Sequence, residues 1–378
     1  MAIAKDVIQH IRDEDNDSYS DDSLFNIKPW GADLSFRELI QRYDDNELVK
    51  PELQRKYVWD RAEASRFIDS LLLGLPVPSI FLAQTQDEKL LIIDGFQRIM
   101  TVYDFVNGIF SRDGKSFSLS RSDKINSRWR GKNFLELSDT EQRRVRNTTI
   151  HAIIFAQQQP SQDDTSLFQV FERINTSGRT LLSQEIRNCV AQGSFNKLLF
   201  SLNDYEPWRR LFGLREPDSR MRDMEFILRF FAITSEKYRS DTREKISLRR
   251  FLDLYMKVNA NLSQEQVNQM SQRFTSAIDL VINTFGGHAF QNISPTDSTR
   301  FVPKFSPTIF DSTLIAADYA LQVGGIIFPQ NPVETRKVLL LEPEYRLAIS
   351  QETMTRVSIK RRVSMACQHL FGISYEQP

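Results

Sequence analysis

The feature that most constrains the fold is a change in the hydrophobic pattern along the 378-residue chain. Before Asp163, short runs rich in β-branched residues alternate with amphipathic helical stretches, as they do in mixed α/β domains. From Asp163 onward, apolar residues recur mostly at helical spacing. The sequence therefore predicts an α+β protein in which an α/β N-terminal domain precedes a mainly α-helical C-terminal domain.

The predicted elements follow from this pattern. In the first part we expect strands over 79–85, 89–95 and 148–157, an extended segment over 47–59, and helices over 34–43, 61–74 and 96–108. Helical stretches then follow at 166–175, 181–193, 222–233, 248–259, 267–285, 312–322 and 353–371.

Charge is balanced overall but uneven along the chain. The 49 Lys and Arg residues equal the 49 Asp and Glu residues, which excludes a polycationic nucleic-acid coat protein. Residues 1–50 hold 6 basic and 12 acidic side chains, whereas residues 112–146 hold 10 basic and 5 acidic ones. We expect an acidic, solvated, mobile leader over 1–24, the α/β domain over 25–195 and the helical domain over 196–378.

Cysteine content and hydrophobicity bear on the compartment. Cys189 and Cys367 lie far apart, so they form neither a disulfide framework nor a CxxC zinc site. No run reaches the ~20 apolar residues of a membrane helix, and the N-terminus turns acidic where a signal peptide would be apolar. A cytoplasmic location without membrane insertion is expected.

The most informative stretch begins at Asp94 and Gly95, which follow an apolar strand and open a helix. Unpaired N–H groups at a helix start attract phosphate, and Gly95 would let the main chain approach a ligand. Arg98 could contact phosphate oxygens, while Asp94 could hold Mg²⁺ or orient a water molecule. The alternative is a plain turn followed by a surface arginine.

A second stretch combines charge with aromatic rings. Arg55 next to Tyr57 and Trp59 could clamp a nucleotide by charge and stacking. Alternatively, Tyr57 and Trp59 alternate onto one face of a strand and pack in the core. A third stretch, "FERINTSGRTLLSQEIR" at 171–187, suits either a ligand-facing loop or an interdomain hinge.

In this order, "RKYVWD", "DGFQR" and "FERINTSGRTLLSQEIR" resemble the N-terminal domain of GmrSD-type restriction endonucleases, domain-of-unknown-function family 262. The resemblance covers roughly residues 25 to 190. It implies a ParB/sulfiredoxin-like α/β fold that binds and hydrolyses a nucleoside triphosphate with Mg²⁺. This turnover would control DNA cleavage in defence against phage, often against modified DNA.

The family signature DGQQR matches this chain at every position except one. Carried over, it implies Asp94, Gln97 and Arg98 as catalytic residues, with Asp94 also holding the metal. The nucleotide-binding residues would be Arg55, Tyr57, Trp59, Gly95, Phe96, Asn175 and Arg179. Phe96 stands where the family usually has Gln, which bears more on hydrolysis than on binding.

A nuclease centre is not expected within this chain. Members of the family often end in an HNH domain, but none of the last three of the four histidines, His151, His288 and His369, lies in such a metal-binding pattern. The nearest candidate is "HAFQN" at 288–292. A partner chain would therefore cut the DNA.

A candidate DNA surface lies in the basic segment, where arginines could contact phosphate and Trp129 could stack on a base. It consists of Arg128, Trp129, Arg130, Arg143 and Arg144. The alternative is a solvated charged hairpin and helix face.

The function expected from the sequence is that of a Mg²⁺-dependent nucleoside triphosphatase in a GmrSD-like defence system, which gates a nuclease partner or DNA contact. The alternative is a non-catalytic nucleotide or DNA sensor that has a degenerate signature. A homo-oligomer is compatible with either function.

Overall fold

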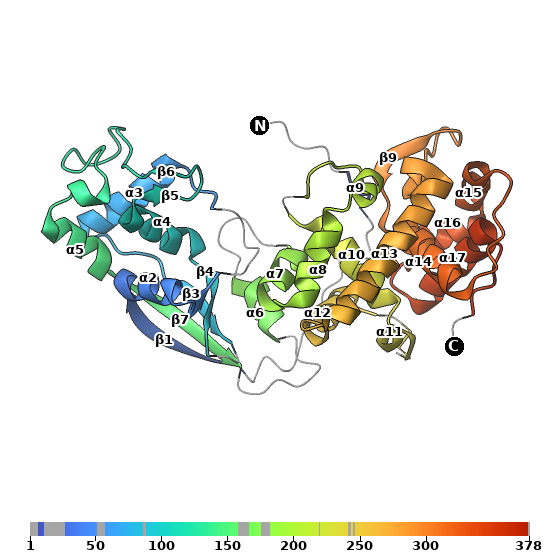
Figure 1. The fold of residues 1–378 in the computed structure, drawn as a ribbon, viewed down its shortest axis with the longest axis horizontal. Coiled ribbons are helices and arrows are strands. Elements are labelled where there is room, and N and C mark those ends of the chain that lie inside the picture. Colours follow the sequence, from blue (N-terminus) through green and yellow to red (C-terminus); the bar gives the residue numbers. More distant parts are fainter. Residues whose placement is uncertain are drawn as a thin grey trace. The chain divides into compact units, whose positions relative to one another are not determined.

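The computed structural model describes residues 7–10, 27–50, 57–85, 88–157, 166–174, 182–218, 220–240, 243–244 and 246–376. The chain divides into two compact units (Figure 1). The α/β unit comprises Asp21–Leu181 and Asn188–Val190. The helical unit comprises Met1–Ser20, Leu182–Arg187 and Ala191–Pro378.

The α/β unit is built on a mixed five-stranded sheet with the order β1-β7-β3-β4-β2. Its strands are β1 (Ile27–Ser35), β2 (Leu48–Val49), β3 (Ile80–Gln84), β4 (Leu90–Asp94) and β7 (Thr149–Gln157). β1 pairs antiparallel with β7 and β3 antiparallel with β4, whereas β7 with β3 and β4 with β2 are parallel pairs. Two parallel pairs require crossover connections, and helices supply them.

Four helices lie on one side of this sheet: α2 (Phe36–Asp44), α3 (Arg61–Leu73), α4 (Phe96–Asn107) and α5 (Asp139–Asn147) (Figure 1). Local capping determines where α3 begins, because Asp60 caps this helix in a capping box with Glu63. α3 ends at Gly74, which takes the left-handed conformation. α6 (Ser166–Ile174) and the end of α7 (Ser183–Val190) also belong to this unit.

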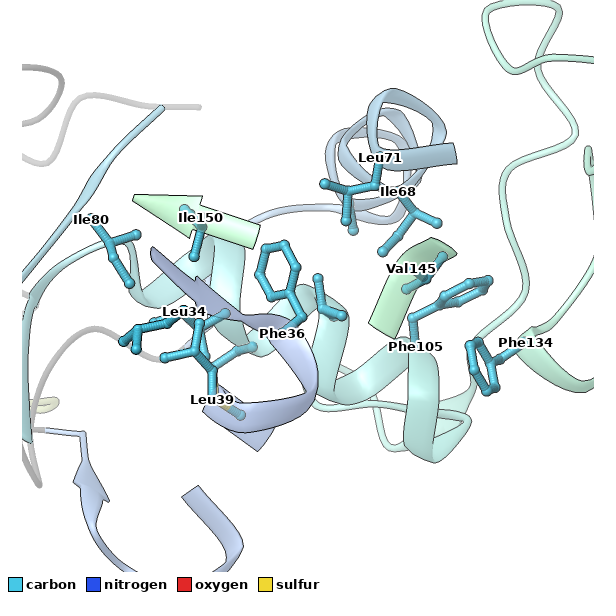
Figure 2. Packing of buried hydrophobic residues seen from close by; sticks show 14 of the residues in the cluster. Leu34, Phe36, Leu39, Ile68, Leu71, Ile80, Phe105, Phe134, Val145 and Ile150 are labelled. Carbon is cyan, nitrogen blue, oxygen red and sulfur yellow. The ribbon is translucent and has the colours of Figure 1, made fainter. Parts of the chain in front are cut away.

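The core of the α/β unit lies between the sheet and these helices (Figure 2). Ile80 and Ile150 point from the sheet towards Phe36, while Ile68 and Phe105 come from the helices, and each of the five is at most 1% exposed. Burial of large aliphatic and aromatic side chains is the main favourable contribution to folding. This core fixes where β4 ends and α4 begins.

An irregular, well-packed segment connects α4 to α5. It contains the small hairpin β5 (Ile109–Phe110) and β6 (Lys115–Ser116) and the short helix η2 (Phe134–Glu136). Arg61 fastens the hairpin to α3, because its guanidinium contacts both carboxylate oxygens of Asp113 and donates to Ser116 O. The basic segment is therefore an ordered part of the unit.

The helical unit contains the following described elements: the start of α7, α8 (Ser194–Asn203), α9 (Glu206–Phe212), α10 (Arg222–Ile233), α11 (Glu236–Ser240), α12 (Leu248–Val258), α13 (Gln264–Phe285), η3 (Gly286–His288), β8 (Gln291–Ile293), β9 (Phe301–Phe305), α14 (Pro307–Val323), α15 (Pro332–Leu341), α16 (Pro343–Ser350) and α17 (Arg356–Phe371). β8 and β9 form a hairpin in this otherwise helical unit. The predicted fold class is confirmed: the N-terminal part is mixed α/β and the C-terminal part is mainly helical.

Part of the expected leader is paired with the helical unit. Ile8 forms a parallel bridge with Phe305, and Gln9 N donates to Phe305 O at 2.8 Å. Residues 7–10 therefore extend the β8–β9 hairpin rather than belonging to a free leader. Residues 1–6 and 11–24 of the predicted leader lie outside the described residues.

Candidate functional site

The candidate site forms where β4 ends and α4 begins. Gly95 separates the two elements and takes a φ of 101°, in the left-handed region that favours glycine. A Cβ atom at this position would lie 2.3 Å from Cγ2 of Ile80. The turn therefore requires glycine both for its conformation and for its space.

The amino end of α4 has no side-chain cap, because Gly95 is its N-cap residue. The first N–H groups of a helix lack intrahelical acceptors and carry the positive end of the helix dipole. Phe96 and Gln97 follow in the first turn, with Phe96 partly buried against the core. This helix start can accept an anion through its main chain.

Arg98 is held by the protein itself. Its Nη2 lies 2.5 Å from Asp94 Oδ2, and its Nη1 donates to the carbonyl oxygens of Pro78 and Ser79 at 2.5 and 3.0 Å. The Arg98 side chain is only 13% exposed, whereas that of Asp94 is 34% exposed. Arg98 thus fastens the residues just before β3 to the end of β4.

Gln97 connects two of the predicted motifs. Its side-chain oxygen accepts hydrogen bonds from the backbone N–H groups of Val58 at 3.0 Å and Trp59 at 3.3 Å. Because these contacts involve the main chain of residues 58 and 59, the amide holds the "YVW" segment beside α4 whatever side chain stands at 58. The sequence suggested a catalytic role for Gln97 but not this connection.

Tyr57 and Trp59 face the core, as in the packing alternative. Tyr57 is 8% exposed, and its ring meets Phe110 edge-to-face. The Thr101 hydroxyl donates to Gln97 O, so the Tyr57 hydroxyl donates to Thr101 at 2.6 Å. Burial raises the pKa of Tyr57 well above its usual value. Tyr57 therefore presents no free face for nucleotide stacking, and Trp59 is partly buried and packs edge-to-face on Phe67.

Three predicted nucleotide-binding residues lie outside the described residues: Arg55, Asn175 and Arg179. The last part of the third motif is described, however. Arg187 Nε lies 2.7 Å from Asp253 and its Nη1 lies 2.7 Å from Glu225, while Glu185 pairs with Arg220 at 2.9 Å. All these partners belong to the helical unit. This end of the motif is a packing element, which the sequence pattern did not reveal.

The predicted DNA surface separates into structural and accessible side chains. Trp129 is 4% exposed and donates its indole N–H to Asp69 at 2.6 Å, so the expectation that it stacks on a base is corrected. Arg130 pairs with Asp123 and caps Ile125 O. These residues hold the irregular segment together.

The other three predicted arginines are exposed and differ in their contacts. Arg144 donates to Leu72 O at 2.9 Å. Arg128 pairs with Glu141 at 2.6 Å while its own side chain is 67% exposed. Arg143 is exposed, with a single long contact to Thr140 at 3.5 Å. All three are exposed, so a nucleic acid could reach each of them, although Arg144 is also engaged with Leu72 O and Arg128 with Glu141.

Two further expectations concern metal and membrane. Within the described residues, no cluster of three or more His, Cys, Asp or Glu side chains could hold a metal ion. His288, the nearest histidine candidate, contacts Gln291 and stacks on Phe301. Mg²⁺ often uses only one carboxylate together with substrate phosphates, and Asp94 fits that mode of binding. No described helix is long and apolar enough to cross a membrane.

The α/β unit is thus a mixed α/β domain. Its distinguishing feature is a D-G-x-Q-R turn that is fastened to a Y-x-W segment. Residues 36–191 match the family model of the GmrSD restriction endonuclease N-terminal domain, which confirms the resemblance drawn from the motifs. A domain of this family implies the setting of a GmrSD-like restriction or defence system. No curated protein matches the chain.

Proposed function

We propose that the α/β unit binds the phosphates of a nucleoside triphosphate at the amino end of α4 and so controls DNA cleavage by a partner nuclease. The observation that carries this proposal is the helix start behind Gly95, where no side chain caps the first main-chain N–H groups. The GmrSD family supplies the DNA-cleaving context. Asp94 would hold Mg²⁺ together with the phosphates, since it is the partly exposed carboxylate at this turn.

Binding without turnover is the version of the proposal that this geometry favours. An arginine that stabilises the transition state of phosphoryl transfer has to reach the transferred group. Arg98 is instead held by Asp94, Pro78 O and Ser79 O. Phe96 also brings a ring, rather than an amide, to the first turn of α4. A hydrolysing enzyme remains the second candidate, with Asp94 positioning metal or water.

The variant Gln97→Glu tests the binding site without removing its support. A carboxylate at position 97 can still accept from Val58 N and Trp59 N, yet it places negative charge at the helix start where phosphate would lie. We expect Mg²⁺–ATP or Mg²⁺–GTP, measured by calorimetry, to bind at least about 10-fold more weakly. Gln264→Glu is the matched control, because it makes the same change in the first turn of α13.

Turnover is tested separately by phosphate release across the four nucleoside triphosphates. Release that is lost in Asp94→Asn, while nucleotide binding persists, would establish the hydrolase. Binding without release would establish the sensor. Equal nucleotide affinity in wild type and Gln97→Glu would contradict the proposed site itself.

A further inference from the structure

We propose that the helical unit carries a basic surface that binds the phosphate backbone of duplex DNA. This surface, called here the α11–α17 surface, is formed by α11, the start of α12, the start of α17 and Arg243 between α11 and α12. Its exposed and partly exposed cations are Lys237, Arg239, Arg243, Arg249, Arg250, Arg356, Lys360 and Arg361. The surface belongs to a different unit from the α4 turn, so it does not depend on nucleotide binding there.

Positive charge is concentrated in two stretches of the helical unit. Residues 236–250 hold six basic and three acidic side chains, and residues 352–362 hold four basic and one acidic side chain. Ten basic against four acidic side chains give a net charge of +6, whereas the whole chain is neutral. Arg362 is buried and paired with Asp311, so its charge does not reach the surface. The remaining surplus is of the kind that attracts a polyanion.

The two stretches lie side by side in the fold. Ile246 N donates to Met354 O at 3.3 Å, and Arg356 N donates to Glu244 O at 2.9 Å. Lys360 is exposed and lies about one turn beyond Arg356 in α17. Basic side chains that are about 100 residues apart in the sequence therefore share one surface.

Arg356 joins α17 to α11 and keeps its charge. Its Nη1 and Nη2 donate to the carbonyl oxygens of Tyr238 and Arg239 at 2.5 and 3.2 Å, and its guanidinium lies over the Tyr238 ring. The same ring meets Phe251 of α12 edge-to-face. Carbonyl groups and a ring hold the guanidinium in place without neutralising it, which lowers the entropy cost of binding a phosphate.

Ion pairing distinguishes this surface from the basic segment of the α/β unit. Five of its cations have no ion pair with a carboxylate among the residues that the structure describes: Arg239, Arg250, Arg356, Lys360 and Arg361. In the basic segment, by contrast, Arg128 pairs with Glu141 and Arg130 with Asp123. A phosphate that binds to the five cations displaces no carboxylate of the described residues, so their charge is available to it.

The form of the surface favours duplex DNA. It extends over three helices, and the phosphates of a duplex are contacted by cations spread over such an area. Tyr238, the ring under Arg356, is 2% exposed and cannot stack on an unpaired base. The GmrSD family supplies the DNA-cleaving context. We expect contact with the backbone and no preference for sequence.

The variant Lys360→Gln with Arg361→Gln tests the surface without disturbing the fold, because both side chains are exposed. Binding of a labelled blunt duplex to the full chain is measured by fluorescence anisotropy, without nucleotide and over a range of salt concentrations. We expect at least about 10-fold weaker binding at about 0.1 M salt, and a slope of log K against log salt that is smaller by about 2. Arg239→Gln in α11 is a second variant, which should weaken binding by a smaller factor.

Matched controls separate this surface from the other cations of the unit. Arg300→Gln with Lys304→Gln also removes two exposed cations, but at the β8–β9 hairpin, at the opposite end of the helical unit from α11 (Figure 1). This variant should bind as wild type does. Lys360→Arg with Arg361→Lys keeps both charges and should retain the affinity and the slope. Thermal unfolding of each variant shows whether the fold is intact.

The proposal is overturned if wild type does not bind the duplex, or if Arg239→Gln and the Lys360–Arg361 glutamine variant bind it as wild type does. An equal loss in the Arg300–Lys304 variant would overturn the location. Vesicles that contain an anionic phospholipid provide a further arm. If the variants weaken vesicle binding while the duplex fails to bind, the surface docks on a membrane and the DNA proposal is wrong.

Discussion

The side-chain oxygen of Gln97 lies 3.0 Å from the backbone nitrogen of Val58, so an amide in the first turn of α4 fastens a segment 39 residues earlier in the chain. Gln97, one of the signature residues, therefore has a structural role in addition to any chemical role. It also predicts which substitutions at position 97 lower the stability of the protein and which do not.

Gln97→Ala should destabilise the protein by about 1 to 2 kcal/mol, because the N–H groups of Val58 and Trp59 lose their acceptor. Gln97→Glu should retain wild-type stability, since the carboxylate accepts the same bonds. Urea denaturation of the two variants and wild type measures the difference. If alanine and glutamate behave alike, the contact does not hold the segment.

Gly95→Ala should cost more stability than Gly108→Ala. Both glycines have a positive φ, 101° and 79°, so alanine suffers a backbone penalty of about 1 to 2 kcal/mol at either position. At Gly95 the new Cβ also meets Ile80 at 2.3 Å, whereas no described atom lies within 4 Å at Gly108. Thermal or urea unfolding of the pair isolates the steric part. Equal losses would show that β3 moves aside freely.

The stability of the Asp104→Asn variant, compared with wild type, should increase as the pH rises. Asp104 is 2% exposed, and burial raises its pKa, although hydrogen bonds from Ser111 oppose this shift. A carboxyl group with a raised folded pKa stabilises the fold at pH values below its unfolded pKa and loses that contribution as it ionises. The stability of the Asp104→Asn variant relative to wild type should therefore increase between about pH 4.5 and about pH 7.5, with unfolding free energies measured in urea at these two values.

Asp113 provides a control of opposite sign for this pH series. Hydrogen bonds from Arg61 hold the pKa of Asp113 below its usual range, so its stabilising contribution is present above the unfolded pKa and is lost in acid. Asp113→Asn should thus lose stability relative to wild type as the pH rises through the acid range up to about pH 4, and the difference should change little between about pH 4.5 and about pH 7.5, so the series for this variant is extended to about pH 2.5. Parallel trends in the two variants would contradict the assignment of either carboxyl group.

Cys367 should not react with thiol reagents in the native protein. It is fully buried in α17, and burial raises the pKa of its thiol to about 12. In a Cys189→Ser background, labelling with an aromatic disulfide at about pH 8 should be absent until denaturant is added, because the thiolate is the reactive form. Rapid labelling under native conditions would show that α17 opens easily.

DNA binding, if it occurs on the basic segment, should depend on Arg143 and Arg128 more than on Arg130. Charge reversal of Arg143 removes only one long contact within the protein, the 3.5 Å contact to Thr140. Arg143→Glu should therefore weaken duplex binding without loss of stability. Arg130→Glu should lower the unfolding temperature, because Arg130 pairs with Asp123 and caps Ile125 O. Salt-dependent binding assays combined with thermal unfolding separate these effects. Unchanged binding by Arg143→Glu would remove the segment from consideration.

Much of the fold was predictable from periodicity, and the exceptions have physical reasons. The helices α2, α3 and α4 and the strands β3, β4 and β7 were predicted, because their apolar residues face one core. β1 was not predicted, since its sequence contains Pro29 and Gly31. At the sheet edge proline is tolerated, and Gly31 leaves room for the His151 ring, which a Cβ would approach to 2.8 Å.

The candidate site was predictable only in part. The strand, the glycine turn and the helix start follow from local sequence, and all three are present. The carbonyl acceptors of Arg98 lie 19 and 20 residues away, and the acceptor of the Trp129 indole lies 60 residues away. Such contacts depend on how distant segments pack, so local patterns cannot distinguish a phosphate-binding arginine from one that supports the turn.

Arg187 has a consequence for how this protein can be divided and recombined. It lies inside residues 36–191, which match the family model, yet its side chain is buried against Asp253 and Glu225. A helical unit expressed from residue 192 onward would lose the Arg187 side of the buried pair with Asp253, and breaking a buried ion pair by removing one partner typically costs about 3 to 5 kcal/mol. The family boundary is therefore not a boundary of folding, and a swap between relatives should exchange α7 together with the helices that follow it.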